Sequence, residues 1–142
     1  MTFALDIERF AQKTDQRLDL IVRKVALEIF SRVVQMTPVD TGRARANWGV
    51  GVNTMPTGTT DATEDPTPDI ESAVAAARAG DTIYLVNNLP YIGMLEYGGY
   101  HEGPRTVGGF SAQAPQGMVR VTLVSFPGIV NQSAAEAKSE RP

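Results

Sequence analysis

The 142-residue chain contains no cysteine, which excludes disulfide bonds, thiolate nucleophiles and zinc–thiolate sites. No apolar run is long enough to span a bilayer, so we expect no membrane contact. The first residues carry Asp6 and Glu8 and lack the basic-then-apolar form of a secretory signal. These absences fit a protein that is made in a reducing cytoplasm.

The chain also lacks an excess of positive charge. It has 13 Lys and Arg residues and 16 Asp and Glu residues, which gives a net charge of −3. Domains that grip nucleic-acid backbone over a broad surface are usually basic. A local basic strip of Arg17, Lys24 and Arg32 is the alternative that would suit a small DNA-binding accessory protein. Glu28 interrupts this strip, so we favour an ordinary polar face of mixed charge.

Catalytic groups are scarce. The single histidine, His101, lies between Tyr100 and Glu102 in a glycine-rich loop with no evident orienting partner, which indicates an exposed loop residue. Four acids stand in a polar loop that lacks apolar neighbours to raise a carboxyl pKa and lacks the spacing of a calcium loop: Asp61, Glu64, Asp65 and Asp69. We therefore predict no enzyme, no cofactor and no metal ion, with a hydrolase using these acids as the less favoured alternative.

What the chain does have is a clear helical period in its first third. Apolar residues recur at spacings of three and four: Leu18, Ile21, Val22, Val25, Ala26, Ile29 and Val33. This predicts a long amphipathic helix that ends near Met36, because Pro38 disfavours helical geometry at Thr37. A shorter stripe from Phe3 to Ala11 predicts a short helix before it. Leu20 and Leu27 lie off the main stripe, and we expect them to touch a neighbouring subunit or a second core layer.

Later segments alternate between strand and helix patterns. Residues 47–53 and 82–87 predict strands, 70–79 a helix stopped by Gly80, and 91–97 a short helix. Loops near 54–69 and 101–112 are predicted to be mobile. Residues 119–131 fit either a strand or a helix kinked at Pro127, and we favour the kinked helix.

The expected fold is a single α+β domain over residues 1–142. A long N-terminal amphipathic helix packs on a small antiparallel sheet, and a kinked helix closes the chain.

Three segments are rich in turn-forming and aromatic residues without forming any catalytic pattern. They are residues 37–48 (TPVDTGRARANW), 87–98 (NNLPYIGMLEYG) and 113–120 (QAPQGMVR). The simplest interpretation is that they are rigid turns that shape the fold, and direct partner contact is the alternative. The residues predicted to serve assembly or to shape the fold are Pro38, Asp40, Thr41, Gly42, Arg43, Trp48, Asn87, Pro90, Tyr91, Leu95, Glu96, Tyr97, Gly98, Pro115, Gly117 and Met118.

In order and spacing these segments resemble the head–tail joining and tail-completion proteins (minor tail or neck proteins) of long-tailed phages, whose pattern is TPVDTGRLRASW, NNxPYAxxLEYG and QAPxGMVR. The insert between Tyr100 and Ala112 is longer than in that pattern, and residues 54–69 carry no family motif. The resemblance implies a virion structural subunit that is made in the host cytoplasm and forms a ring, usually hexameric, in the neck. It also implies contacts with a connector or stopper ring on one side and a tail terminator or tube on the other, with DNA only passing through the lumen.

Overall fold

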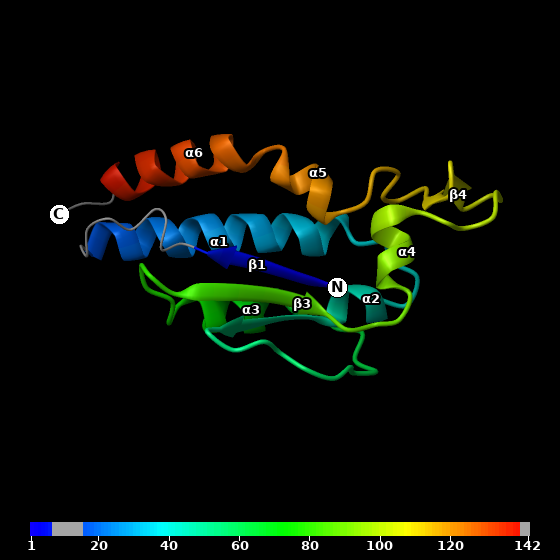
Figure 1. The fold of residues 1–142 in the computed structure, drawn as a ribbon, viewed down its shortest axis with the longest axis horizontal. Coiled ribbons are helices and arrows are strands. Elements are labelled where there is room, and N and C mark those ends of the chain that lie inside the picture. Colours follow the sequence, from blue (N-terminus) through cyan, green and yellow to red (C-terminus); the bar gives the residue numbers. More distant parts are fainter. Residues whose placement is uncertain (7–15, 140–142) are drawn as a thin grey trace.

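The computed structural model describes residues 1–6 and 16–139, which form an α+β fold of stacked layers (Figure 1). A three-stranded sheet lies at the base, α1 (Gln16–Met36) lies on it, and α5 (Val119–Leu123) and α6 (Phe126–Ser139) lie on α1. The remaining elements are α2 (Arg43–Ala46), α3 (Thr67–Val74), α4 (Ile92–Tyr97) and a hairpin of β4 (Thr106–Val107) and β5 (Phe110–Ser111). The predicted fold class is confirmed.

The main sheet has the order β1-β3-β2, with both pairs antiparallel. Its strands are β1 (Thr2–Asp6), β2 (Trp48–Val52) and β3 (Thr82–Asn87), and Leu85 lies opposite both Phe3 and Val50. The prediction of a helix around Phe3 is therefore wrong, because pairing with distant β3 decides the conformation of residues 2–6. The rest of that stripe, at residues 7–11, lies outside the described residues.

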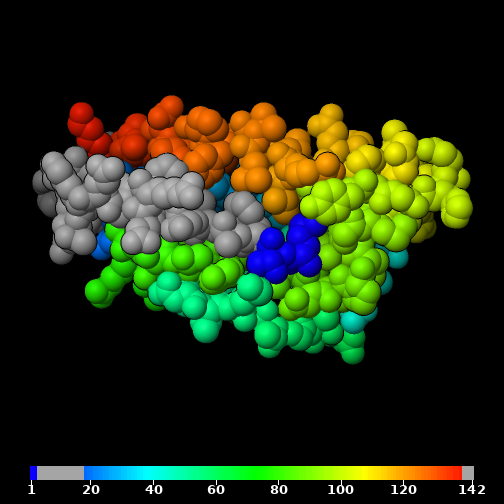
Figure 2. All heavy atoms as spheres, viewed as in Figure 1, coloured from blue at the N-terminus to red at the C-terminus, as the bar shows by residue number. Residues whose placement is uncertain are grey.

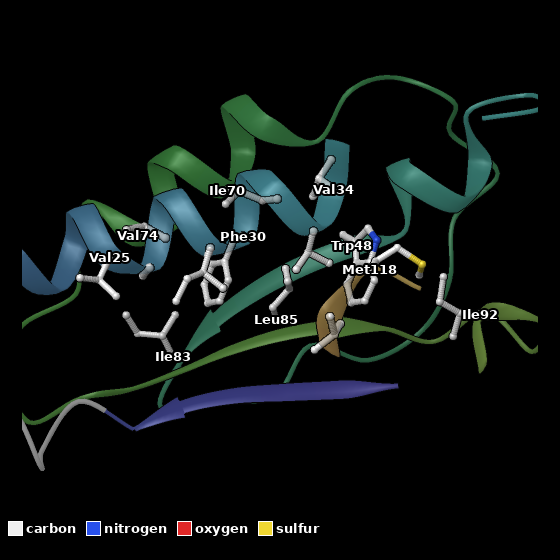
Figure 3. Close-up of a cluster of buried hydrophobic side chains, with 14 of the residues drawn as sticks. Val25, Phe30, Val34, Trp48, Ile70, Val74, Ile83, Leu85, Ile92 and Met118 are labelled. Carbon is white, nitrogen blue, oxygen red and sulfur yellow. The ribbon is translucent and has the colours of Figure 1, made fainter. Parts of the chain in front are cut away.

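The long helix α1 ends at Met36, as predicted, and the Thr37 amide still donates to the Val33 carbonyl at 3.1 Å. Figure 3 shows Phe30 pointing from α1 toward β3, the strand that carries Ile83 and Leu85. The side chains of all three are fully buried, which stabilises the fold by about 1.5–3 kcal/mol for each.

The helix α1 also packs against α6, so it is covered on two sides. This explains its second apolar line. Leu27 is half-buried and packs against the same hydrophobic core. Leu20 is also half-buried, and the contact expected for it stays a prediction.

The helix α3 starts at Thr67 rather than Ile70 and ends at Val74 rather than Ala79. Its early start has a local cause, because the Asp65 carboxylate accepts hydrogen bonds from the Thr67 amide (2.9 Å) and hydroxyl (2.6 Å).

The C-terminal segment is a broken helix rather than a strand. It is interrupted at Val124 and Ser125, and Pro127 lies in the first turn of α6, where a missing amide hydrogen costs nothing. Among the described residues, no helix combines the length and apolarity that crossing a bilayer requires.

The two predicted loops are more structured than expected. Residues 101–112 contain the β4–β5 hairpin. In the other loop, the amide side chain of Asn47 donates to the Thr60 carbonyl (2.9 Å) and accepts from the Thr60 amide (2.9 Å), which ties residue 60 to the body. The predicted mobility of both loops stays a prediction.

Candidate assembly site

The three motif segments, far apart in the sequence, meet at the end of the molecule formed by α2, α4 and the start of α5 (Figure 1). We call residues 37–43 the strap and residues 99–112 the hairpin arm. The contacts below show how the strap, α4 and the start of α5 are held together.

The strap begins at a buried hydrogen-bond chain. The indole Nε1 of Trp48 donates to the Thr37 hydroxyl at 2.8 Å, and this hydroxyl donates to the Val33 carbonyl at 2.7 Å. Both side chains are at most 2% exposed, so each polar atom needs such a partner. Arg45 donates to the Thr37 carbonyl at 2.7 Å. The end of α1, the strap and β2 are thereby fixed to one another.

The second segment is anchored by Asn87, which is fully buried at the end of β3. Its side-chain amide donates to the Ala44 carbonyl at 2.8 Å, and its Oδ1 accepts from the Leu89 amide at 3.1 Å. The first bond ties β3 to α2, and the second shapes the turn that leads into α4. Asn87 therefore shapes the fold, as the simpler interpretation predicts.

The most concentrated set of bonds surrounds Glu96, a carboxylate only 1% exposed. It accepts from the backbone amides of Met118 (2.7 Å), Val119 (2.9 Å) and Arg120 (2.9 Å), and from Arg120 Nε at 3.0 Å. These amides belong to the first turn of α5, which no side chain of its own caps. Glu96 on α4 thus caps a helix that begins more than twenty residues later.

Burial alone raises the pKa of Glu96, but the hydrogen bonds from Met118, Arg120 and Val119 outweigh it and hold the pKa below its ordinary value. The Arg120 guanidinium also lies 4.6 Å from the centre of the Tyr97 ring, which is 65% exposed. The segments 87–98 and 113–120 are therefore two halves of one clamp.

Glycine is required at two positions of this region. A Cβ on Gly117 (φ +82°) would lie 2.5 Å from the Glu96 carbonyl oxygen, and one on Gly42 (φ +95°) would lie 2.5 Å from the Thr63 carbonyl oxygen. Gly117 lets the chain pass close to α4 before α5 begins. Gly42 lets the strap lie against the loop that follows β2.

An open groove of about 700 Å³ lies between the strap and the hairpin arm. Its apolar lining includes Ala44, Tyr91, Leu95 and Tyr100. The side-chain amide of Gln113 holds the two walls together, because its Oε1 accepts from the Val39 amide (2.8 Å) and its Nε2 donates to the Val39 carbonyl (2.9 Å).

The groove also has a charged pair in its lining. Asp40 and Arg105 approach to 3.9 Å, and both side chains are 87% exposed. Such an exposed pair contributes little to folding, so these charges are available to a docking partner.

The predicted site residues fall into three groups. Those that line the groove are Pro38, Asp40, Thr41, Gly42, Tyr91 and Leu95. Those that support it from inside are Trp48, Asn87, Glu96, Gly117 and Met118. Those outside both are Arg43, Pro90, Tyr97, Gly98 and Pro115.

In this last group, Arg43 pairs with Asp61 at 3.3 Å, Gly98 closes α4 as predicted, and Pro90 and Pro115 are exposed.

Three residues that form side-chain contacts at this end were not predicted. Arg120 and Gln113 lie inside the motif segments. Nothing in the local sequence indicates that Arg120 bonds to α4 or that Gln113 bonds to the strap. Arg105 lies in the hairpin arm, where no pattern signalled a role.

The groups considered for catalysis are spread over exposed surface. His101 and all four acids of the polar loop are exposed. The pKa of Asp65 is lowered, chiefly by hydrogen bonds from the side chain and backbone of Thr67, whereas a general acid needs a raised pKa. In the described part of the chain, no group of three His, Asp or Glu side chains is arranged to hold a metal ion.

The structure describes the side chains of two cations of the proposed basic strip, and both form ion pairs with acidic residues of the same chain. Arg32 pairs with Glu28 at 2.8 Å, and Lys24 pairs with Glu136 at 3.6 Å. Arg23, next to the strip, donates to the Ala77 carbonyl at 2.7 Å. This arrangement favours the polar face of mixed charge over a DNA contact.

No protein-family model, no curated protein and no solved structure matches this chain. Its function is therefore inferred from the motif resemblance and from the geometry of this end of the molecule.

Proposed function

We propose that this chain is a structural subunit of the neck of a long-tailed phage, where copies form a ring at the head–tail junction. The ring joins a connector or stopper to a tail terminator or tube, and DNA passes through its lumen. One observation carries the proposal: the three motif segments fold into a single rigid end of the molecule, and a groove opens there to solvent.

The polar groups of this end support a structural rather than a chemical role. Thr37, Asn87 and Glu96 are buried, and the hydrogen bonds that define their positions go to backbone or side-chain groups of the chain itself. An active site needs a group aimed at a reacting atom. A docking surface needs rigid backbone, because a preorganised surface loses less entropy on binding.

The distribution of exposed apolar side chains points the same way. Among the described residues, the large hydrophobic side chains that are exposed are Val39, Met55, Met94, Tyr97, Val107, Leu123 and Val124. All but Met55 belong to the strap, α4, the hairpin arm or α5 and its C-cap. Exposed apolar groups gathered on one region of a surface are typical of a protein–protein contact.

A reconstitution experiment tests the proposal. Phage with the gene disrupted should yield filled heads and separate tails, and adding the purified protein should restore joined, infectious particles. Normal joined particles from the disrupted phage would contradict a neck function.

A variant that lacks the carboxylates of the acidic loop tests the hydrolase alternative. Replacing Asp61, Glu64, Asp65 and Asp69 together by Asn or Gln should leave joining unchanged, because these side chains are exposed and lie outside the groove lining. Loss of infectivity in this variant, with heads and tails still joined, would favour the hydrolase alternative.

A further inference from the structure

We propose that the loop of residues 54–63, which we call the covering loop, positions the strap for docking, and that Asn88 is a positioning residue that acts through this loop. The proposal rests on the proposed function, because the strap belongs to the end of the molecule that this function uses for docking. It follows from the place of the covering loop on the sheet, from the bonds that fix it there, and from its contacts with the strap.

The covering loop lies on the face of the sheet that is turned away from α1 (Figure 1), and its atoms lie along the lower edge of the molecule in Figure 2. Neighbouring side chains of a strand point to opposite faces, so Val86 lies on this face, whereas Leu85 belongs to the core beneath α1. Val86 is outside that core and yet only 1% exposed. Together with Gly49 and Pro56 it lines a small gap of about 210 Å³ between the loop and the sheet. The covering loop therefore buries this part of the outer face.

The strand β2 carries two glycines beneath the covering loop. Gly49 pairs with Val86, and Gly51 lies two residues further on, so both are on the outer face. A Cβ on Gly51 would lie 1.9 Å from the Thr54 carbonyl oxygen and 3.0 Å from Pro56 Cδ. A Cβ on Gly49 would lie 3.6 Å from Pro56 Cβ, which is an ordinary contact. The position of the loop therefore requires glycine at 51 and tolerates a side chain at 49.

Two asparagines fix the covering loop to the body of the molecule. Asn88, directly after β3, donates from its side-chain amide to the carbonyls of Gly58 (3.1 Å) and Pro56 (3.4 Å). Asn47 holds the next turn of the loop through its two bonds with Thr60. Asn88 is exposed, so its side chain fills no position in the core. Its bonds serve the covering loop.

The far end of the covering loop contacts the strap. Arg43, the last residue of the strap, donates from Nε to the Thr60 carbonyl at 3.2 Å. The Thr63 carbonyl lies so close to Gly42 that no Cβ would fit between them. The Arg43–Asp61 ion pair adds little, because the Asp61 side chain is 99% exposed. Backbone contacts, rather than the acids of the loop, therefore hold this end of the strap.

The strap is thus held near both of its ends. Gln113 bonds to the backbone of Val39 near its start, and the covering loop contacts Gly42 and Arg43 at its end. A surface that is fixed before binding loses less entropy when it docks. The covering loop, which carries no family motif, contributes to docking by fixing the strap.

Hydrogen exchange of the full chain tests this role with a matched pair of variants. Gly51→Ala displaces the covering loop, so the amides of Val39 and Ala46, which bond to Gln113 and to the Gly42 carbonyl, should exchange at least about tenfold faster. Gly49→Ala adds the same methyl group to the same face of β2 and should leave both rates unchanged. Equal rates in the two variants would overturn the proposal.

A variant of exposed Asn88 tests the same role without touching β2. Asn88→Asp keeps the shape of the side chain but cannot donate, so the amides of Thr60 and Ala46 should exchange at least about threefold faster. Asn88→Gln keeps the amide donor and should restore most of the protection. Asn131→Asp, at an exposed position on α6, controls for the added charge. Faster exchange of Thr60 with an unchanged rate at Ala46 would overturn the proposal, because the loop would then move without the strap.

The joining of heads to tails separates this proposal from the neck function. Asn88→Asp should reduce joining, and Asn131→Asp should not. Normal joining by an Asn88→Asp protein whose strap exchanges faster would overturn the role of the covering loop in docking and leave the neck function standing. A wild-type protein that never joins particles would remove the neck function, whereas faster exchange of the strap in Asn88→Asp would still support the hold of the covering loop on the strap.

Discussion

At the scale of single residues, buried polar side chains that bond to backbone decide the shape of the molecule. Glu96 binds three amides of a distant helix, Asn87 binds the carbonyl of Ala44, and Thr37 joins Trp48 to α1. The sequence identified Glu96 and Asn87 as important by resemblance only. Their bonding partners could not be predicted, because these partners are backbone atoms that only the fold brings near.

The Glu96 clamp predicts a defined pH dependence of stability. The carboxylate has a lowered pKa in the folded state, so its stabilising contribution is fully present above the unfolded value of about 4.3 and is lost as pH falls through the folded pKa. The free energy of unfolding, measured with urea, should therefore fall below about pH 4.3. In Glu96→Gln that part of the pH dependence should disappear.

At neutral pH, Glu96→Gln should lower the free energy of unfolding by about 2–4 kcal/mol, because a buried charge-assisted network loses its anion. Glu102→Gln is the control, since Glu102 is exposed. Asp65 also has a lowered pKa, so protonation of Asp65 at low pH also destabilises the folded protein. Asp65→Asn is therefore a second control, which separates the contribution of Asp65 to the acid range from that of Glu96. Equal stability of the wild type and Glu96→Gln would refute the clamp.

At the scale of elements, local sequence patterns sufficed to predict those helices and strands whose conformation is set by their own residues. The helix α1, the strands β2 and β3, and the short α4 with its closing Gly98 were predicted, since their periods and end signals lie within the segments themselves. The strand β1 was missed, because its conformation comes from pairing with β3 across about eighty residues. Phe30 is fully buried yet lay off the predicted stripe, because α1 is covered from two sides.

The turn before α5 is an element-level prediction with a matched control. Gly117 and Gly58 share a φ of +82°, but a Cβ at Gly117 meets the Glu96 carbonyl oxygen at 2.5 Å, whereas one at Gly58 meets nothing within 4 Å. Gly58→Ala should cost about 1–2 kcal/mol of stability from backbone strain alone. Gly117→Ala should cost clearly more, measured by thermal or urea unfolding, and equal costs would contradict the close packing of α4 and α5.

At the scale of the whole molecule, buried and exposed side chains occupy different sides of the same elements, and we propose that the exposed sides serve docking. Leu95, Glu96 and Val119 face inward, while Tyr97, Leu123 and Val124 on the same or adjoining turns are exposed. The groove combines residues from segments that the sequence separates by more than seventy positions, so its shape could not be predicted from sequence.

This separation predicts a variant that folds normally but assembles poorly. Val124, which is 81% exposed, contributes little to the core, so Val124→Asp should change the free energy of unfolding by less than about 0.5 kcal/mol. It should reduce the joining of heads to tails in the reconstitution experiment. Ala135→Asp on α6, also exposed, should do neither. Normal joining with Val124→Asp would exclude this side of α5 from the contact.

We propose above that this chain is a ring subunit at the head–tail junction. Imaging of intact particles that carry an epitope tag on the chain, decorated with an antibody fragment, tests it most directly. We expect label in a ring at the neck, between the head vertex and the tail tube. Particles that lack the chain, or that carry the label on the capsid shell or at the distal tail tip, would contradict it.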